Sequence, residues 1–366
     1  MNYVEIIKYA VFLFPVIAFI MSFPFILYEY HKYGSISFLK AFIIYSLTFY
    51  LLCAYFLVIL PLPKISEVEL LTTPRTQLIP FKFICDFVSH TSLNILDIHT
   101  YIKALKQSWF YVPVFNIFLT LPFGVYLSYY FKCDLKKTTL YTFLLSLFFE
   151  LTQLTGLYFI YPRGYRLFDV DDLILNTTGG IVGFLVAKWI KKIPPSRDEI
   201  DKKAIENGKT LSGFRRTTAF LFDFFIFSVI NIILILILIF KHDIYIFYAM
   251  TIIYYFIIPL FKKGSTCGQS YLNIKTVDYS KKYKVFRVIF RRLLFIIIYI
   301  GIPLLILYYI GNINKQINEF IGCLVLFIYF IFDMVSGFKY LFSNKQLIFE
   351  KISKTKMEST IGNNEM

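Results

Sequence analysis

Long apolar runs constrain the fold of this chain more than any other feature. Nine segments approach or exceed the roughly 20 apolar residues that cross a hydrocarbon core about 30 Å thick. Because backbone N–H and C=O groups find no water at that depth, each segment is expected to form a helix. The sequence therefore predicts an all-α membrane protein, a polytopic bundle of about nine transmembrane helices, with these approximate spans: Tyr9–Tyr28, Phe38–Leu60, Trp109–Phe131, Thr139–Ile160, Leu173–Ile190, Thr217–Phe240, Ile244–Phe261, Leu293–Ile310 and Phe320–Leu341.

The basic residues favour one orientation of these helices. The net charge is +15, and 28 of the 38 Lys and Arg residues fall in the inner segments when the N-terminus is placed outside. Lys and Arg accumulate on the cytoplasmic side of membrane proteins. We therefore predict a multi-pass protein of the cell membrane, with the N-terminus outside and the C-terminus in the cytoplasm. The lipid bilayer is its expected partner, and the positive charge requires no nucleic acid.

Composition shifts divide the chain into parts. A polar stretch with a double proline ends the first five predicted spans near Pro195. We predict a membrane domain at 1–194, a polar cytoplasmic linker at 195–212, a second membrane domain of three or four spans at 213–342, and a basic, polar, mobile tail at 343–366.

Further features of the sequence bear on the fold and the chemistry. The 61–108 connection contains an apolar stretch at 77–88 that is too short to span, so we expect an interfacial or re-entrant element on the outer face. The five cysteines show no C-x-x-C spacing and have the character of packing residues. Motifs of the H-E-x-x-H and calcium-loop types are missing from the sequence, so neither a metal site nor a cofactor is predicted.

Ionisable side chains interrupt the apolar pattern between the fourth and fifth spans. Glu150 and Gln153 lie three residues apart and share one helical face. Asp169, Asp172 and Asn176 follow spacings of three and four and share a face of the next helix. Charged groups at membrane depth are usually paired, hydrated or functional. Two interpretations stay open: hydrogen bonds that hold the bundle together, or two walls of a polar pocket.

Asp171 adds a third carboxylate beside Asp169 and Asp172 at the predicted helix start. One Asp there is explained as a helix cap, but three exceed what a cap requires. Arg163 and Arg166 precede the carboxylates and either offset their charge or bind a phosphate or carboxylate through parallel hydrogen bonds. We take all of these side chains as ligand-binding candidates and assign no catalytic residue.

Five motifs in order carry a family resemblance: Q-L-I-P-F at 77–81, V-F-N-I-F-L-T-L-P-F-G at 114–124, S-L-F-F-E-L-T-Q at 146–153, R-L-F-D-V-D-D-L-I-L-N at 166–176 and G-G-I-V-G at 179–183. From about Phe38 to Trp189 the chain resembles the VanZ-like family. The resemblance implies a role in low-level resistance to glycopeptide antibiotics of the teicoplanin type. It also implies that the family's polar positions are Glu150, Gln153, Arg166, Asp169, Asp171, Asp172 and Asn176.

The second half has charged positions of its own. Arg216 and Asp223 lie two helical turns apart on one face, and Asp333 lies within the ninth span. Pairing of each Asp with Arg216, or with Arg291 or Arg292, competes with an ion or proton pathway. The 264–278 loop ends in β-branched alternation, which predicts a short cytoplasmic hairpin.

The motifs R-x-x-A-x-x-x-D at 216–223, G-S-T-x-G-Q with I-K-T-V-D at 264–278, Arg291 or Arg292, and Asp333 resemble the RDD family. This resemblance covers about Gly213 to Phe342. It implies transport of cations, protons or small solutes by some relatives.

Three functions therefore stay open. The first is an envelope protein without enzymatic activity, whose outward polar site engages a cell-wall precursor, a lipid head group or a glycopeptide. The second is a transporter that carries protons or Na⁺ on intramembrane carboxylates. The third is a membrane hydrolase or transferase acting on a lipid-linked phosphate. The sequence favours a non-enzymatic protein, because the four histidines lie away from the polar stretch and no nucleophile–base pair is legible. The oligomeric state is left open.

Overall fold

The computed structural model describes residues 3–190, 194–237, 244–280, 282, 284–311, 316–342 and 346–362. Within these ranges seven helices are long and apolar enough to cross a membrane, which confirms a polytopic, all-α membrane protein. The end of the sixth predicted span at Phe240 lies outside the described residues. The seven candidate spans are Val4–Tyr33, Phe38–Ile59, Ser108–Tyr129, Val170–Ile190, Gly213–Leu234, Val285–Tyr308 and Leu324–Phe342.

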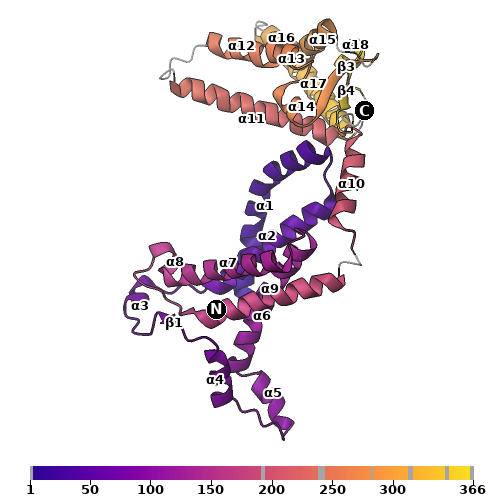
Figure 1. Cartoon of the computed structure of the whole chain (residues 1–366). Helices are drawn as coiled ribbons and strands as arrows, with labels where there is room; N and C mark the ends of the chain where they lie inside the picture. The colour runs from indigo at the N-terminus through magenta and orange to yellow at the C-terminus, as the bar shows by residue number, and fades with distance from the viewer. Residues whose placement is uncertain are drawn as a thin grey trace. The chain divides into compact units, whose positions relative to one another are not determined.

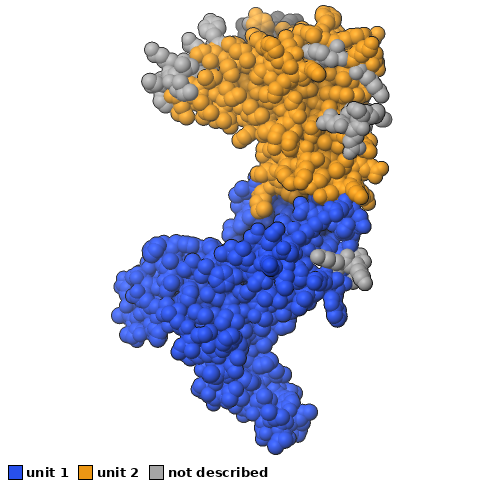
Figure 2. All heavy atoms as spheres, viewed as in Figure 1, with its two compact units in different colours: residues 1–20, 38–200 blue, residues 21–37, 201–366 orange. Residues whose placement is uncertain are grey.

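The chain forms two compact units (Figure 2). Unit 1 comprises residues 1–20 and 38–200, and unit 2 comprises residues 21–37 and 201–366. One of the boundaries between the units, at 200/201, falls in the predicted polar linker, which contains a helix of its own, α10 (Arg197–Gly208).

Unit 1 is a helical bundle with one excursion, the 61–108 connection (Figure 1). Its helices are the first part of α1 (Tyr3–Tyr33), then α2 (Phe38–Ile59), α3 (Ile65–Glu69), α4 (Lys82–His90), α5 (His99–Leu105), α6 (Ser108–Tyr129), α7 (Leu135–Leu154), the short turn α8 (Gly156–Phe159), and α9 (Val170–Ile190). α6 and α9 share the most extensive contact between elements of the described chain, and α7 packs on α9.

The 61–108 connection is an ordered excursion in which no helix is long enough to span. It holds α3, α4 and α5, and one short strand, β1 (Thr76–Gln77). β1 pairs in parallel with β2 (Phe168–Asp169), with Thr76 opposite Phe168. This pairing fixes the excursion to the segment that begins α9. In Figure 1, α4 and α5 lie beyond the start of α6.

Unit 2 combines apolar helices with a small sheet (Figure 1). After α10 come α11 (Gly213–Ile237), α12 (Ile244–Ile252), the π-helical turn η1 (Ile253–Ile257), α13 (Ile258–Phe261), α14 (Cys267–Tyr271), β3 (Ile274–Asp278), α15 (Val285–Ile296), the π-helical turn η2 (Ile297–Gly301), α16 (Ile302–Gly311), α17 (Gln316–Phe342), α18 (Ile348–Ile352) and β4 (Thr355–Ser359). The seventh predicted span corresponds to the shorter apolar helix 246–261.

Each π-helical turn precedes a proline in the sequence. Pro259 follows η1 and Pro303 follows η2. A proline cannot donate a hydrogen bond to the preceding turn, so backbone carbonyls there need other donors. Arg292 Nη1 donates to the Tyr255 carbonyl 2.6 Å away, and the Tyr329 hydroxyl donates to the Ile298 carbonyl. Side chains from neighbouring helices thus satisfy the backbone at both kinks.

The sheet of unit 2 differs from the predicted local hairpin. β3 pairs antiparallel with β4, and Ile274 lies opposite Ser359. The predicted mobile tail is therefore wrong for residues 346–359, which form α18 and β4. The inner face of β3 is buried, which explains why a polar segment far along the chain is held in place. Residues 343–345 and 363–366 of that tail lie outside the described residues.

Candidate functional site

Two polar rungs join the parallel helices α6 and α9. Asn116 Nδ2 donates to Asp172 Oδ1, and the Thr120 hydroxyl donates to the Asn176 carbonyl at 2.6 Å. Both rungs join residues 56 positions apart, which is the signature of two helices running in the same direction. Residues four apart on each helix share a face, so the rungs form one polar edge.

Glycines allow this pair of helices to approach closely. A Cβ atom built at Gly124 would lie 2.2 Å from the Gly180 carbonyl oxygen, and one at Gly183 would lie 2.1 Å from the Leu121 carbonyl oxygen. Real Cβ atoms do not approach backbone oxygens so closely, so a side chain at either position would force the helices apart. Small residues at a helix interface allow such close packing in membranes.

α7 completes the cluster from the opposite direction. The Ser146 hydroxyl donates to the Asp172 carbonyl at 3.4 Å, and Asn176 Nδ2 donates to Ser146 Oγ at 3.0 Å. Since α6 and α9 are parallel, the chain between them must return along the bundle, and α7 is the helix that does so. Its 20 residues extend about 30 Å. α7 thus corresponds to the fourth predicted span, although its Lys and Glu residues keep it out of the apolar set.

Glu150 and Gln153 each contact the backbone of a neighbouring segment. Glu150 is 2% exposed, and its Oε2 accepts a hydrogen bond from the Asp169 backbone N–H at 2.9 Å. Gln153 Nε2 donates to the Val58 carbonyl in α2 at 3.1 Å. Both side chains therefore satisfy backbone groups of neighbouring segments.

Asp171 connects the start of α9 to the start of α4. Its two carboxylate oxygens accept the backbone N–H groups of Phe81 at 2.6 Å and Phe83 at 2.8 Å. Phe81 has a φ of 62°, a left-handed conformation that costs a bulky residue free energy. The buried carboxylate compensates for that cost by binding the N–H group of the same residue. Asp171 is thus the anchor of the excursion.

Asp169 caps α9 and also faces the excursion. Its Oδ1 accepts the Asp171 backbone N–H at 2.8 Å and lies 3.3 Å from the Gln77 amide nitrogen. Burial raises the pKa of Asp169, while the Asp171 N–H, the Gln77 amide and the Lys82 charge act in the opposite direction. The Asp169 carboxylate is therefore held by donors from both α9 and β1.

The two arginines bind backbone carbonyls. Arg163 donates to the Leu71 carbonyl and, at 2.5 Å, to the Thr73 carbonyl. Arg166 Nη2 donates to the Leu60 carbonyl at 2.5 Å. These contacts fix the end of α2 and the 71–73 loop.

A pocket of about 680 Å³ lies between the 73–82 segment and the 164–167 segment. Its lining includes the cationic residues Lys82 and Arg166 and the buried Gln77, and no acidic side chain is among the described residues that line it. The predicted carboxylates are not among these lining residues, but Asp169 and Asp171 hold the 77–83 segment in place. The complete lining is Thr73, Pro74, Thr76, Gln77, Leu78, Ile79, Lys82, Gly164, Tyr165, Arg166 and Leu167.

Sequence reasoning missed five polar residues of this region: Gln77, Lys82, Asn116, Thr120 and Ser146. All except Lys82 stood inside motifs quoted for the resemblance but were not identified as site residues. The spacing of Asn116 and Thr120 is the same as that of Asp172 and Asn176, which was a usable signal. Lys82 carried no such signal, because its importance depends on a loop that folds back to it.

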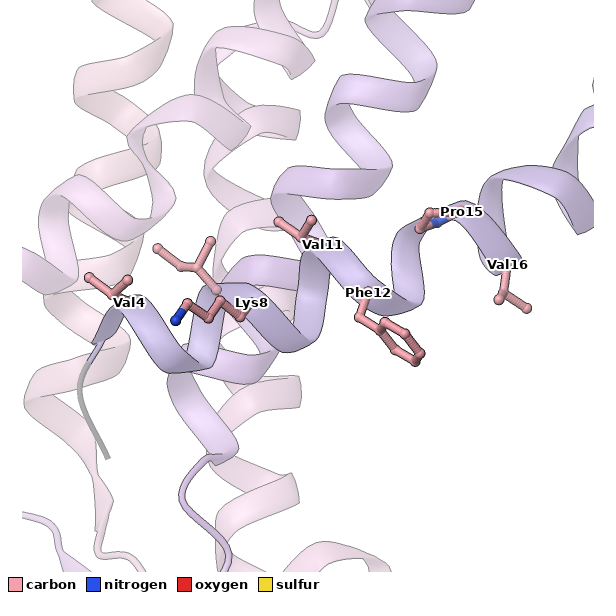
Figure 3. Close-up of a pocket in the computed structure, with 7 residues that line it drawn as sticks. Val4, Lys8, Val11, Phe12, Pro15 and Val16 are labelled. Atoms are coloured by element: carbon pink, nitrogen blue, oxygen red, sulfur yellow. The ribbon is translucent and has the colours of Figure 1, made fainter.

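A second groove runs along α1 and offers no comparable chemistry (Figure 3). Its lining is apolar except for Lys8, and it lies on a candidate membrane span. The surface suits contact with lipid. The lining residues are Val4, Ile7, Lys8, Val11, Phe12, Pro15 and Val16.

In unit 2, Asp223 binds the start of α14. It accepts hydrogen bonds from the Tyr254 hydroxyl at 2.8 Å, the Thr266 hydroxyl at 2.5 Å and the Gly268 backbone N–H at 2.7 Å. Arg216 donates to the Tyr340 carbonyl at 3.2 Å and stacks on the Tyr340 ring, 4.6 Å from its centre.

Arg291 pairs with a residue that the sequence did not single out. Its Nη2 lies 2.8 Å from Oε1 of Glu350, and both side chains are almost fully buried. Asp333 differs from these satisfied groups. Its Oδ1 is buried in α17 and has no hydrogen-bond partner among the described residues.

Arg215, the neighbour of a predicted position, is the most enclosed cation of the described chain. Its guanidinium is fully buried and donates to the Gly34, Gly208, Leu272 and Asn273 carbonyls and to the Ser359 hydroxyl. The first two carbonyls end α1 and α10, where the helix dipole favours a positive charge. One side chain therefore ties five segments of unit 2 together.

Metal binding gains no support from the geometry. Among the described residues no group of three or more His, Cys, Asp and Glu side chains is arranged to hold a metal ion. The four cysteines whose side chains are described, Cys53, Cys85, Cys133 and Cys267, are free thiols.

The parallel helix pair, the returning helix and the buried polar rungs define an integral, multi-pass membrane protein made of helical units. Family comparison gives the membership of each half: the VanZ/LLP1 family matches residues 47–191, and the RDD family matches residues 212–354. The chain therefore joins a VanZ/LLP1 domain to an RDD family domain, as the resemblances implied. The second match extends into α18, beyond the predicted domain end at 342. No curated protein and no solved structure matches the chain.

Proposed function

We propose that this protein binds an anionic ligand of the cell envelope in the pocket between the 73–82 and 164–167 segments, and thereby lowers susceptibility to teicoplanin-type glycopeptides. The observation that carries the proposal is the pair of cations, Lys82 and Arg166, in a pocket without acidic lining. Ammonium and guanidinium groups are the usual protein partners of phosphate and carboxylate.

The frame behind the pocket supports this function. Binding sites gain affinity when their loops are held before the ligand arrives. Asp171 holds the start of α4, and β1 pairs with β2, so both pocket walls are attached to the start of α9. In this proposal Asp171 orders the site, while the anion contacts Lys82 and Arg166.

The proposed orientation makes this pocket accessible from outside the cell. With the N-terminus outside, the segments at 61–108 and 161–169 face the wall, where a precursor or a glycopeptide is present. The basic residues of the connecting segments support this orientation.

The test compares two exposed lysines in a teicoplanin-susceptible host that expresses the full chain. Lys82→Glu reverses the charge in the pocket and is expected to reduce the inhibitory concentration of teicoplanin to that of the host without the chain. Lys103→Glu on α5 carries the same charge change outside the pocket lining and is expected to leave tolerance unchanged. Equal tolerance of both variants at equal membrane abundance contradicts the proposal.

A second candidate function is cation or proton movement through the RDD family domain. One observation favours it: the buried Oδ1 of Asp333 has no hydrogen-bond partner in the part of the chain that the structure describes. Intramembrane carboxylates of this kind mark ion pathways. Everted vesicles with a pH-sensitive dye test it, because Asp333→Asn should abolish cation-dependent proton flux. A flux unchanged by this substitution, or missing from the unsubstituted protein, refutes it.

A further inference from the structure

Exposed apolar side chains continue outward from the cationic pocket. Leu78 and Ile79 line the pocket and are 62% and 66% exposed. Phe81, Ile84 and Val88 continue the surface along α4 and are 54%, 48% and 71% exposed. Ile84 and Val88 lie four apart on one face of α4, and Phe81 directly precedes the helix. We call Leu78, Ile79, Phe81, Ile84 and Val88 the apolar strip.

The apolar strip is held in a fixed position relative to the cations. The backbone N–H groups of Phe81 and Phe83, at the start of α4, are bound by the Asp171 carboxylate at 2.6 and 2.8 Å. Gln77, directly before the strip, accepts the Ile79 N–H at 2.6 Å through its own amide oxygen. The strip therefore begins at a pinned turn on the rim of the pocket, and Lys82 is part of the same turn.

A soluble anion would use the cations alone and leave the strip exposed to water. Contiguous exposed apolar surface of this kind marks a binding surface, because burying it is favourable by about 25 cal/mol per Å². Because the apolar strip adjoins the pocket that contains Lys82 and Arg166, the two together suit a ligand with a negatively charged head and an apolar chain.

Resting on the proposed function, we infer that the ligand is an anionic amphiphile, whose phosphate or carboxylate head contacts Lys82 and Arg166 and whose hydrocarbon chain lies along the apolar strip. The head chemistry is common to a lipid-linked phosphate and to a free phosphate. The chain distinguishes them, since only the first has a group that covers Ile79 and Ile84.

The experiment measures binding of three probes to the full chain in phosphatidylcholine nanodiscs, with the signal of protein-free nanodiscs subtracted. Farnesyl phosphate has both head and chain, farnesol has the chain alone, and methyl phosphate has the head alone. The variants are Ile79→Ser and Ile84→Ser in the strip and Lys82→Ala in the pocket. Leu96→Ser, which changes a residue 96% exposed outside the strip, is the matched control.

The inference predicts that each strip variant weakens farnesyl phosphate binding about tenfold and leaves methyl phosphate binding unchanged, since each removes apolar contact worth roughly 1 kcal/mol or more. Lys82→Ala weakens both phosphates by about tenfold, as expected for a hydrogen bond to a charged group. Leu96→Ser changes neither. Comparison between variants in the same nanodiscs cancels the partition of farnesyl phosphate into lipid.

Other results overturn the inference in distinguishable ways. If the strip variants leave farnesyl phosphate binding unchanged, the strip only rests on the bilayer or on another protein copy, and the amphiphile inference fails while the anion pocket stands. If farnesol binds as tightly as farnesyl phosphate, the charge has no part in recognition and the inference fails. If Lys82→Ala has no effect on either phosphate, the proposed function itself fails.

Discussion

The buried ion pair between Arg291 and Glu350 should control the closure of the α18–β4 segment. Glu350→Ala removes the carboxylate that lies 2.8 Å from Arg291 Nη2, and it also removes the acceptor of the Leu347 backbone N–H at 2.9 Å. The two side chains are 6% and 1% exposed, so the arginine would be left buried without its counter-charge. Such a loss costs about 3–5 kcal/mol.

Limited proteolysis measures this cost directly. When opening is faster than cleavage, the cleavage rate follows the population of the open state. A loss of about 3 kcal/mol raises that population by roughly 100-fold, so trypsin should cleave after Lys351 about 100 times faster in Glu350→Ala. Each rate is divided by the rate for the same variant unfolded in urea, which removes any effect of the substitution on trypsin itself.

A neighbouring pair provides the matched control. Lys356 and Glu358 lie 2.8 Å apart in β4 with side chains 31% and 24% exposed, so Glu358→Ala should cost at most about 1 kcal/mol and change cleavage by no more than about fivefold. Replacing the buried pair together, as Arg291→Met with Glu350→Leu, should recover most of the protection. Equal cleavage of Glu350→Ala and Glu358→Ala would refute the reasoning.

Three further outcomes are expected. Gly183→Ala should destabilise the α6–α9 pair by about 1–3 kcal/mol through overlap with the Leu121 carbonyl, whereas Gly337→Ala, which meets nothing within 4 Å, should be neutral or stabilising by up to about 1 kcal/mol; thermal unfolding in detergent compares them. Arg215→Met should lower the unfolding temperature of the purified protein, because four carbonyls and a hydroxyl lose a buried donor. The Ser280 hydroxyl, followed by the Lys284 ammonium and the Lys282 N–H, holds the pKa of Asp278 well below its usual range. Its stabilising contribution is therefore present above about pH 4 and is lost as pH falls further, so the unfolding temperatures of the unsubstituted protein and Asp278→Asn should converge between pH 4 and pH 2.

The membrane class and the family membership could be predicted from the sequence because they depend on local patterns. A run of apolar residues or a motif can be recognised within a single segment of the sequence. The helical face of Asp172 and Asn176 was also predictable from their spacing of four. Asn116 and Thr120 in α6 have the same spacing of four, but no local pattern shows that their face meets residues 56 positions later.

The functions of the charged residues were the least predictable part. Nearness in sequence suggested that Arg163 and Arg166 would pair with the acids that follow them. In the folded chain their donors meet carbonyls at Leu60, Leu71 and Thr73, which lie about 90 or more residues earlier. A backbone carbonyl that needs a donor leaves no mark in a sequence.

The pairing of β3 with β4 has a consequence for synthesis. β3 ends at Asp278 and β4 begins at Thr355, so about 80 residues, including two membrane-spanning stretches, are translated between them. At roughly 5–20 residues per second, the open edge of β3 waits for about 4–16 seconds on the ribosome. Unpaired strand edges are templates for wrong pairing. Translational pauses within this stretch would prolong that exposure, and a nascent chain arrested before Thr355 would present quality control with an unfinished sheet.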